Sequence, residues 1–481
     1  MGKIFNEVDK LVRNNYKFFT TPGHKNGEAY KDLDFSFHHD ITEVKGSDNL
    51  HNPLSCIKHS LDKLKNFYES KKSYYLVNGS TSGIQIMIFS SFNEGDEILI
   101  ERGCHKSIIN GIFLRKLKVN YIDREIYNLD FLNSKDDLKI NYNKEDLFFN
   151  VIKEKIEKNK NIKGVILTNP NYYGIYIDQE KIYNYLNKGN ILLLIDSAHG
   201  AHIRGFNKRL RCTNKYCDLN VMSAHKTLGA LTQGGYLHVN NEKLIDKADL
   251  YFSIFTTTSP SYLIMESLEK ALEDCTKYDQ EILIKRCDKF RDFINENTNL
   301  YGLNNFYIKE RSNNNFSFDD TRICLKFKNH NSNGNFLYEY LFSKKIICEM
   351  SFFNGVILIP TIYTKEEDFI FLEKCIKEFK SNQEIYDVDE IIFKACSLNY
   401  EKVLEPYEIE NFNYEILPIK ECEGRILFND IFLYPPGTPI IFRGERILIE
   451  SLKLIYKYQE MGFEVNGLID DKYLKVIEEK I

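Results

Sequence analysis

A lysine and an aspartate, each placed just after an apolar strand, could together do chemistry on a bound cofactor. Lys226 follows a short apolar run that ends at Ser223, and Asp196 ends another apolar run thirty positions upstream. In a parallel sheet such strand ends meet at one edge. An amine forms a Schiff base with an aldehyde, and a carboxylate keeps a pyridine nitrogen protonated. The pair therefore suits pyridoxal 5′-phosphate (PLP), although a lone lysine after a strand is more often a solvated end.

A turn rich in Gly, Ser and Thr predicts an anion site. Residues 77–83 read Val-Asn-Gly-Ser-Thr-Ser-Gly, so Ser80 and Thr81 lie between an apolar strand and a helix. Backbone N–H groups at a helix N-terminus, together with hydroxyl groups, bind phosphate. Capping of the helix by Ser or Thr is the equal alternative. Because the segment lacks the lysine of a P-loop and the GxGxxG of a dinucleotide fold, an NTP or NAD is less expected.

Three further polar segments are candidates for the site. His105 stands between a strand and a helix, where it could cap the helix or lie flat over an aromatic cofactor. The segment from Thr20 to Gly27 combines turn signals with a His and a Lys, and reads as a polar loop or as an arm near an active site. An irregular acidic stretch holds Glu43 and Asp48, which could contact a cation of the substrate or simply be solvated.

Composition excludes several classes of protein. The 481 residues are 43% hydrophobic and 28% charged, with a net charge of −5, which does not favour nucleic-acid or membrane-surface binding. No apolar run reaches the ~18 residues of a membrane helix. The eleven cysteines have no metal-ligand spacing, so we expect no metal site and a reducing cytoplasmic location, with disulfide pairing of ten of them as the alternative.

The order of the elements predicts the fold class. Apolar strands near 74–77, 97–100, 119–122, 163–168, 191–195, 221–223 and 235–239 alternate with helices, which indicates an α/β fold with a mainly parallel sheet. Ligands in such sheets bind beyond the carboxyl ends of the strands, and Ser80, His105, Asp196 and Lys226 all follow strands. One long helix is expected to end near residue 295. We expect an arm over 1–30, a large domain over 31–275, a small α+β domain over 276–385 and a C-terminal domain over 386–481.

With these residues in place, the chain resembles the Orn/Lys/Arg family of PLP-dependent decarboxylases almost from end to end. The resemblance is carried, in the family's order, by seven short motifs: Thr21–Lys25, Val77–Gly83, His105–Ser107, Asp196–His202, Ser223–Thr227, Thr257–Tyr262 and Tyr434–Gly437. It implies the aspartate aminotransferase-like fold, called fold type I, and the short form without a receiver-like N-terminal domain. It also implies decarboxylation of arginine, lysine or ornithine in polyamine biosynthesis by a homodimer or a dimer-based oligomer.

The resemblance also implies a role for each matched residue. Lys226 would form the Schiff base, Asp196 would pair with the ring nitrogen, and His105 and Ala198 would lie on either face of the ring. His199 would lie near the phenolic oxygen. The implied phosphate ligands are Ser80, Thr81, Ser223 and His225, with Thr257 or Thr258 reaching the phosphate of a neighbouring subunit. Two departures, Ser197 where many members have Glu and Thr438 where Ile is usual, are expected to have little effect.

Two other functions fit the same residues. An aminotransferase or lyase of this fold would keep PLP, and an aminotransferase usually holds the α-carboxylate with an arginine, for which Arg322 is the candidate. Because a tightly paired carboxylate is a poor leaving group, a decarboxylase tends to lack that clamp. A PLP-binding regulator would bind the cofactor without turning over an amino acid.

Overall fold

Two compact units make up the part of the chain that the computed structural model describes. That part comprises residues 13, 16–32, 37–122, 147–206, 213–311, 316–328, 333–380, 398, 400–434 and 438–478. The first unit consists of 1–83, 169–178 and 196–386, and the second of 84–168, 179–195 and 387–481. The four-part division expected from the sequence has different limits and stays a prediction. Residues 1–12, 14 and 15 of the expected arm and the Pro435–Gly437 turn lie outside the described residues.

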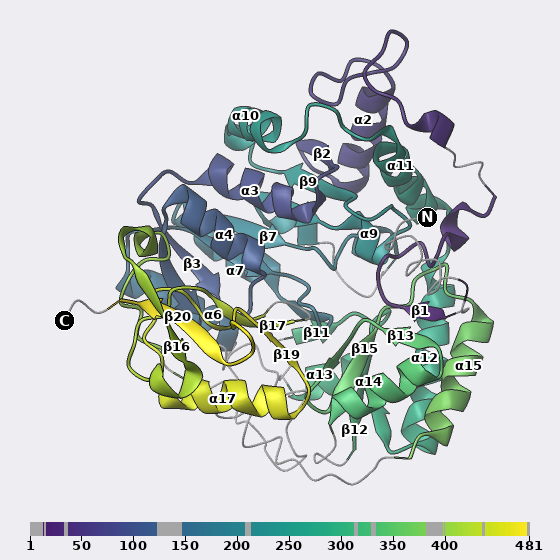
Figure 1. Ribbon diagram of the computed structural model, residues 1–481. Helices are drawn as coiled ribbons and strands as arrows, with labels where there is room; N and C mark the ends of the chain where they lie inside the picture. The colour runs from purple at the N-terminus through teal and green to yellow at the C-terminus, as the bar shows by residue number, and fades with distance from the viewer. Residues whose placement is uncertain are drawn as a thin grey trace. The chain divides into compact units, whose positions relative to one another are not determined.

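The first unit is built from three separate stretches of the chain, which the colours of Figure 1 follow by residue number. Its elements are β1 (Lys17–Phe19), η1 (Glu28–Tyr30), η2 (Phe37–His39), α2 (Cys56–Tyr68), β2 (Lys72–Leu76), the start of α3 (Gly79–Ser91), β6 (Ile175–Ile177), α8 (Ile203–Phe206), η4 (Thr213–Tyr216), β8 (Leu219–Met222), α9 (Ala224–Thr227), β9 (Gly235–Val239), η5 (Glu242–Leu244), α10 (Ile245–Phe255), α11 (Tyr262–Lys277), α12 (Gln280–Asn297), β10 (Leu300–Gly302), α13 (Asn305–Arg311), β11 (Phe316–Phe318), β12 (Ile323–Phe327), α14 (Gly334–Ser343), β13 (Ile346–Cys348), β14 (Met350–Phe352), β15 (Gly355–Leu358) and α15 (Glu366–Glu378).

The second unit joins the middle of the chain to its C-terminal segment. Its elements are the rest of α3, β3 (Glu97–Glu101), α4 (Lys106–Arg115), β4 (Lys118–Ile122), α6 (Leu147–Lys158), β5 (Ile162–Thr168), α7 (Gln179–Lys188), β7 (Leu192–Asp196, whose last residue belongs to the first unit), η6 (Glu408–Asn411), β16 (Tyr414–Pro418), η7 (Ile419–Glu421), β17 (Ile431–Tyr434), β18 (Thr438–Ile441), α17 (Ile449–Glu460), β19 (Glu464–Asn466) and β20 (Tyr473–Ile477).

The central sheet has seven strands, with the order β2-β9-β8 in the first unit and β7-β5-β3-β4 in the second. β3 pairs in parallel with β4 and β5, whereas β9 is antiparallel to β2 and β8. β2, β7 and β8 are buried along almost their whole length, as expected for strands covered on both faces. The predicted α/β class with a mainly parallel sheet is therefore confirmed.

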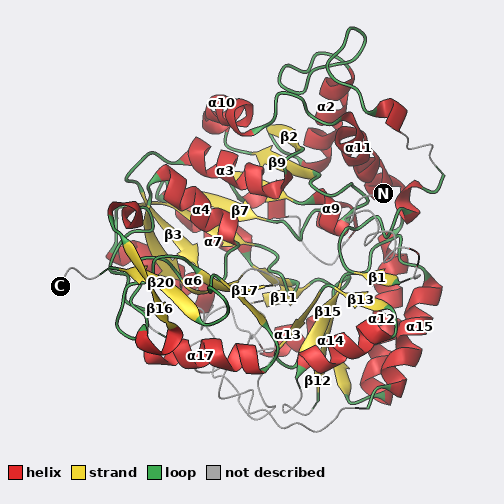
Figure 2. Ribbon diagram, viewed as in Figure 1, coloured by secondary structure: helices red, strands yellow, loops and turns green. Residues whose placement is uncertain are grey.

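A second, antiparallel sheet lies within residues 300–358, in the order β10-β12-β15-β14. Apolar residues of α12, α14 and α15 pack with it in one core, which includes Phe290, Leu337 and Leu372. Figure 2 shows these helices around the strands. The expected small α+β architecture is thus present in this part of the chain.

The long helix expected to end near residue 295 is in fact two helices, α11 and α12. The chain turns between them at Tyr278 and Asp279, where the Asp279 carboxylate accepts a hydrogen bond from the backbone N–H of Glu281 at 2.9 Å. An aspartate at this place satisfies an N–H group that a new helix leaves unpaired. The amphipathic pattern continues across the break, which is why periodicity alone missed it.

Candidate active site

Lys226 stands on the single turn α9, directly after β8. Its Nζ atom lies 3.1 Å from Nε2 of His199. Desolvation lowers the pKa of Lys226, and the charge of Arg322 acts in the same direction, although Asp196 and Glu349 oppose the shift. A larger fraction of Lys226 is therefore present as the neutral amine, which is the nucleophilic form.

Asp196 is the buried carboxylate at the end of β7. It is 3% exposed, and its Oδ1 atom accepts a hydrogen bond from the backbone N–H of Ala198 at 3.0 Å. Burial raises the pKa of Asp196, while Lys226 and the Ala198 N–H group oppose that rise. Because burial penalises the charged form, an ionised Asp196 is stabilised by a cationic hydrogen-bond partner in the site.

Ser80 and Ser223 meet at the N-terminus of α3. The Ser223 hydroxyl donates to Oγ of Ser80 at 2.8 Å. A Cβ atom at Gly83 would lie 2.5 Å from the Leu76 side chain and 3.0 Å from that of Val221, so a glycine lets α3 lie close against β2 and β8. The first N–H groups of a helix lack intrahelical partners, and here they lie beside two hydroxyl groups, which is a setting that suits a phosphate.

The other predicted phosphate ligands have different surroundings. Nδ1 of His225 lies 3.0 Å from the carbonyl oxygen of Gly234, so Nδ1 donates, and burial is the main cause that lowers the pKa of His225 to about 4. The Thr257 N–H group donates to Oδ1 of Asn78 at 3.3 Å, which places Thr257 next to the turn before α3 in the same chain. Thr81 and Thr258 are exposed. Their contacts with a phosphate stay predictions.

The segment from Thr20 to Lys25 packs on the loop that carries Lys226. The Gly23 N–H group donates to the carbonyl of His225 at 2.6 Å, and a Cβ at Gly23 would lie 2.1 Å from the Leu228 oxygen. Lys25 donates to the carbonyls of Thr20 and Ile359, both at 2.7 Å. Burial is the main cause that lowers the pKa of Lys25 to about 7.

Glu349 is a site residue that the sequence did not reveal. It joins β13 to β14, and its carboxylate accepts hydrogen bonds from the Thr20 hydroxyl, the Thr21 N–H group and the Tyr172 hydroxyl at 2.7–2.8 Å. Burial opposes its ionisation, but these donors and Lys226 keep the pKa of Glu349 below its ordinary value. A single acid inside an apolar run was the signal for it. Glu349 therefore supplies a negative charge near Lys226.

His199 lies between several of these groups. Its ring packs edge-on against Tyr172, with 4.5 Å between the ring centroids. Its Nδ1 atom lies 3.3 Å from an Nη2 nitrogen of Arg322, which is 1% exposed at the start of β12. Arg322, the candidate for a carboxylate clamp, therefore contacts a histidine of the site.

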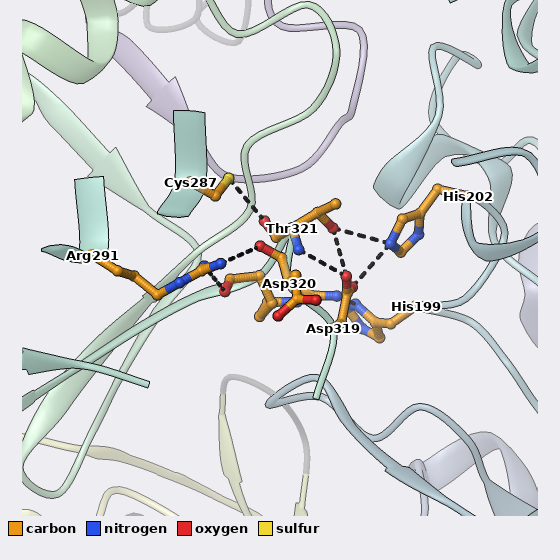
Figure 3. A network of polar contacts seen from close by, with 8 residues as sticks. His199, His202, Cys287, Arg291, Asp319, Asp320 and Thr321 are labelled. Atoms are coloured by element: carbon orange, nitrogen blue, oxygen red, sulfur yellow. Dashed lines mark hydrogen bonds and ion pairs between the residues drawn. The ribbon is translucent and has the colours of Figure 1, made fainter. Parts of the chain in front are cut away.

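The turn before Arg322 is held on both sides by polar contacts. Asp319 accepts from His202 at 2.9 Å and from the Thr321 hydroxyl at 2.7 Å, as Figure 3 shows. Arg291 of α12 donates to the carbonyl of Asp320 at 2.8 Å. Burial opposes ionisation of Asp319, but His202, Arg322 and Thr321 hold the pKa of this carboxyl well below its usual range. The turn is therefore a charged, buried support of the site.

Asp48 has a structural role beside its expected contact with substrate, which stays a prediction. Its two carboxylate oxygens accept hydrogen bonds from five backbone N–H groups before and at the start of α2, those of Asn49, Leu54, Ser55, Ile57 and Lys58. These contacts occupy the lone pairs that a substrate cation would need. Glu43 keeps a buried Oε1 atom without a hydrogen-bond partner among the described residues, so its role stays a prediction.

His105 and Ser197 have well-defined local contacts. Nδ1 of His105, in the second unit, accepts from the Ser107 N–H group at 3.2 Å and caps α4. Its predicted stacking over a cofactor stays a prediction. The Ser197 hydroxyl donates to the carbonyl of Asn169 at 2.7 Å.

The residues of the first unit fit PLP. Lys226 offers an amine whose pKa is lowered by burial, and a protonated pyridine nitrogen would provide the cationic partner that stabilises ionised Asp196. The Ser80–Ser223 pair at a helix N-terminus suits the phosphate.

Among the described residues, no group of three or more His, Cys, Asp or Glu side chains could hold a metal ion. No helix in this part of the chain is long and apolar enough to cross a membrane, and its nine cysteines are free thiols.

Fold and site together define a fold type I PLP-dependent enzyme. The family model described as "Orn/Lys/Arg decarboxylase, major domain" matches residues 3–339, and the model of its C-terminal domain matches residues 394–467. The chain belongs to the Orn/Lys/Arg decarboxylase family, which confirms the family expected from the motifs, and it is an amino-acid decarboxylase.

Similar proteins agree with this assignment. The chain is 31% identical over 500 residues to the uncharacterized protein YaaO of Bacillus subtilis (strain 168), covering 99% of both chains. It is 27% identical to an arginine decarboxylase of the same organism, covering 96% of this chain and 95% of that protein. The crystal structure of the Francisella novicida lysine decarboxylase LdcF matches with a TM-score of 0.75 and 19% identity, covering 98% and 80% of the two chains, which supports the fold.

Proposed function

We propose that this protein uses PLP to remove the α-carboxylate of a basic amino acid, releasing CO₂ and an amine that feeds polyamine biosynthesis. The observation that carries the proposal is the meeting of Lys226, His199 and the buried Asp196 beside the Ser80–Ser223 pair, in a chain of this family. Arginine is the first substrate to test, because an arginine decarboxylase is among the full-length relatives.

Each side chain has a separate role in the proposed reaction. PLP, when bound, supplies an electron sink for the electron pair of the breaking bond between Cα and the carboxylate. Lys226 would hold the cofactor through its side-chain amine. Asp196 holds a proton on the ring nitrogen by a charge-assisted hydrogen bond. The 3.1 Å contact between Lys226 and His199 joins two groups that can return a proton to Cα after CO₂ has left.

The phosphate ligands and the assembly belong to the same proposal. Ser80, Thr81, Ser223 and His225 bind the phosphate, with Thr257 or Thr258 of a neighbouring subunit. His105 stacks on one face of the ring and Ala198 on the other. The working form is a dimer or a dimer-based oligomer in the cytoplasm. Glu43 is retained as a candidate contact for the cation of the substrate.

Incubation of the PLP-loaded protein with arginine, lysine and ornithine, each labelled in the carboxylate, tests the proposal. We expect labelled CO₂ and the matching amine from at least one of them, and none from aspartate as a control. Keto-acid formation without CO₂ would show an aminotransferase instead. Bound PLP with no turnover of any amino acid would show a binding protein.

A further inference from the structure

Arg322 is a buried cation that contacts a histidine of the site. Its Nη2 nitrogen lies 3.3 Å from Nδ1 of His199, and it is 1% exposed. Its Nε and Nη1 atoms have no hydrogen-bond partner among the described residues. The contact with His199 is therefore made through Nη2, while Nε and Nη1 stay available to a ligand.

A guanidinium group donates hydrogen bonds and cannot accept them. Nδ1 of His199 must therefore be the acceptor, and a neutral His199 carries its ring proton on Nε2. That nitrogen faces the Nζ atom of Lys226 at 3.1 Å. A neutral amine has a lone pair that can accept from Nε2–H, whereas an ammonium group has none.

We propose that Arg322 fixes the tautomer of His199 and so holds Lys226 as an oriented, neutral amine ready to capture the aldehyde of PLP. Arg322 is then a positioning residue that acts through His199. The inference rests on the proposed function, because it assigns how the PLP-binding lysine is prepared.

The charges around this chain of contacts agree with the geometry. Lys226 faces Asp196 and Glu349, which favour its ammonium form, and Arg322, which opposes it. Desolvation is the largest influence, and the pKa of Lys226 is lowered in total. His199 has the Tyr172 ring on one side and Arg322 on another.

The position of Arg322 is itself well fixed. Its N–H group donates to the carbonyl of Asp319 at 2.9 Å, and its carbonyl accepts from Arg291 at 3.4 Å. Asp319 is in turn paired with His202. The backbone at Arg322 is therefore held from both sides.

The first test measures how fast the cofactor-free protein captures PLP, followed by absorbance from about pH 6 to about pH 10, a range that covers ordinary and lowered lysine pKa values. Arg322→Met removes both the charge and the donor, so we expect the midpoint of the rate profile to rise by roughly one pH unit. Arg322→Lys keeps a cationic donor and should restore most of the wild-type midpoint. An unchanged midpoint in a folded Arg322→Met protein would overturn the inference, and a higher KM for the amino acid with that unchanged midpoint would show a carboxylate contact instead.

A second measurement needs no variant at position 322 to fold. In the cofactor-free wild-type protein with ¹⁵N-labelled histidine, NMR should show His199 protonated on Nε2 and unprotonated on Nδ1. The signal is identified by its loss in His199→Gln. A proton on Nδ1 would overturn the inference. If the wild-type protein captured no PLP at any pH, the proposed function would be wrong. The NMR measurement of the His199 tautomer would still test the role of Arg322.

Discussion

Lys226 and Asp196 would carry opposite charges in water, and both are buried in this site. Lys226 is stabilised as an amine by desolvation, whereas Asp196 is forced by burial toward its neutral form. Each shift opposes the charge that the residue would carry in water. A bound cofactor with a cationic ring nitrogen would stabilise the carboxylate, so the site is matched to a ligand of that charge pattern.

Asp196→Asn should leave PLP capture by Lys226 in place but lower kcat by roughly 10²–10³-fold, as the loss of one strong electrostatic contact in an active site commonly does. The amide cannot keep a proton on the ring nitrogen. In the wild-type protein, binding of PLP to the cofactor-free chain should weaken as the pH is lowered through the raised pKa of Asp196, because the ring nitrogen then loses its charged partner. Steady-state rates and PLP binding across pH measure the two effects. Wild-type kcat in Asp196→Asn would contradict the assigned role.

Whether a site residue could be predicted from the sequence depended on how far along the chain its partners lie. Lys226, Asp196 and Ser80 could be found because each follows an apolar strand, and strand ends of a parallel sheet converge. Glu349 could not, because its donor Tyr172 lies 177 residues away and no local pattern joins them. The hydrogen bonds between Asp48 and the start of α2 could not be predicted either, because a loop separates the two in the sequence.

Among the elements of the second unit, β3 and the C-terminal segment are joined by a buried ion pair. Arg102 donates two hydrogen bonds to Glu445, at 2.6 and 2.8 Å, and both side chains are almost fully buried. The guanidinium lies over the rings of Tyr121, Tyr400 and Phe442, at 4.5–4.9 Å from their centroids. Arg102 is three residues before His105, so the pair also holds the start of that loop.

Glu445→Gln should lower the free energy of unfolding by about 3–5 kcal/mol, because it leaves the buried Arg102 charge without its partner. The exposed pair of Arg446 and Glu401 offers a matched control in the same segment. Glu401→Gln should cost at most about 1 kcal/mol. Denaturant unfolding of the three proteins measures the difference. Equal stability of the two variants would contradict the structural role of the buried pair.

At the scale of the whole molecule, each of the two compact units is built from segments that are not consecutive in the chain. Residues 387–481 belong to the same unit as residues 84–168. Lys402 donates to the carbonyl of Val119 at 2.6 Å, and the backbone N–H group of Val119 donates to the Glu405 carboxylate at 3.0 Å. The ring of Phe442 stacks on Tyr121 at 4.9 Å. The C-terminal segment therefore supplies partners to β4, an edge strand of the central sheet. Strand patterns could predict the sheet, but not which distant segment covers its edge.

Removal of residues 400–481 should unfold the second unit, because it takes away Glu445, Glu405 and the ring of Phe442 together. We expect either no soluble protein or fast amide hydrogen exchange over residues 97–122 compared with the full chain. The full chain under the same conditions is the control. A truncated protein with full-length protection over these residues would contradict this account of the C-terminal segment.

The central claim is that Lys226 is the amine that holds PLP. Lys25 is a useful internal rival, since burial is the main cause that lowers its pKa to about 7. Borohydride reduction of the PLP-loaded protein followed by mass spectrometry of its peptides locates the cofactor. We predict one PLP group per chain on the peptide that contains Lys226, and none in Lys226→Arg. Label on Lys25, or equal labelling of Lys226→Arg, would contradict the account.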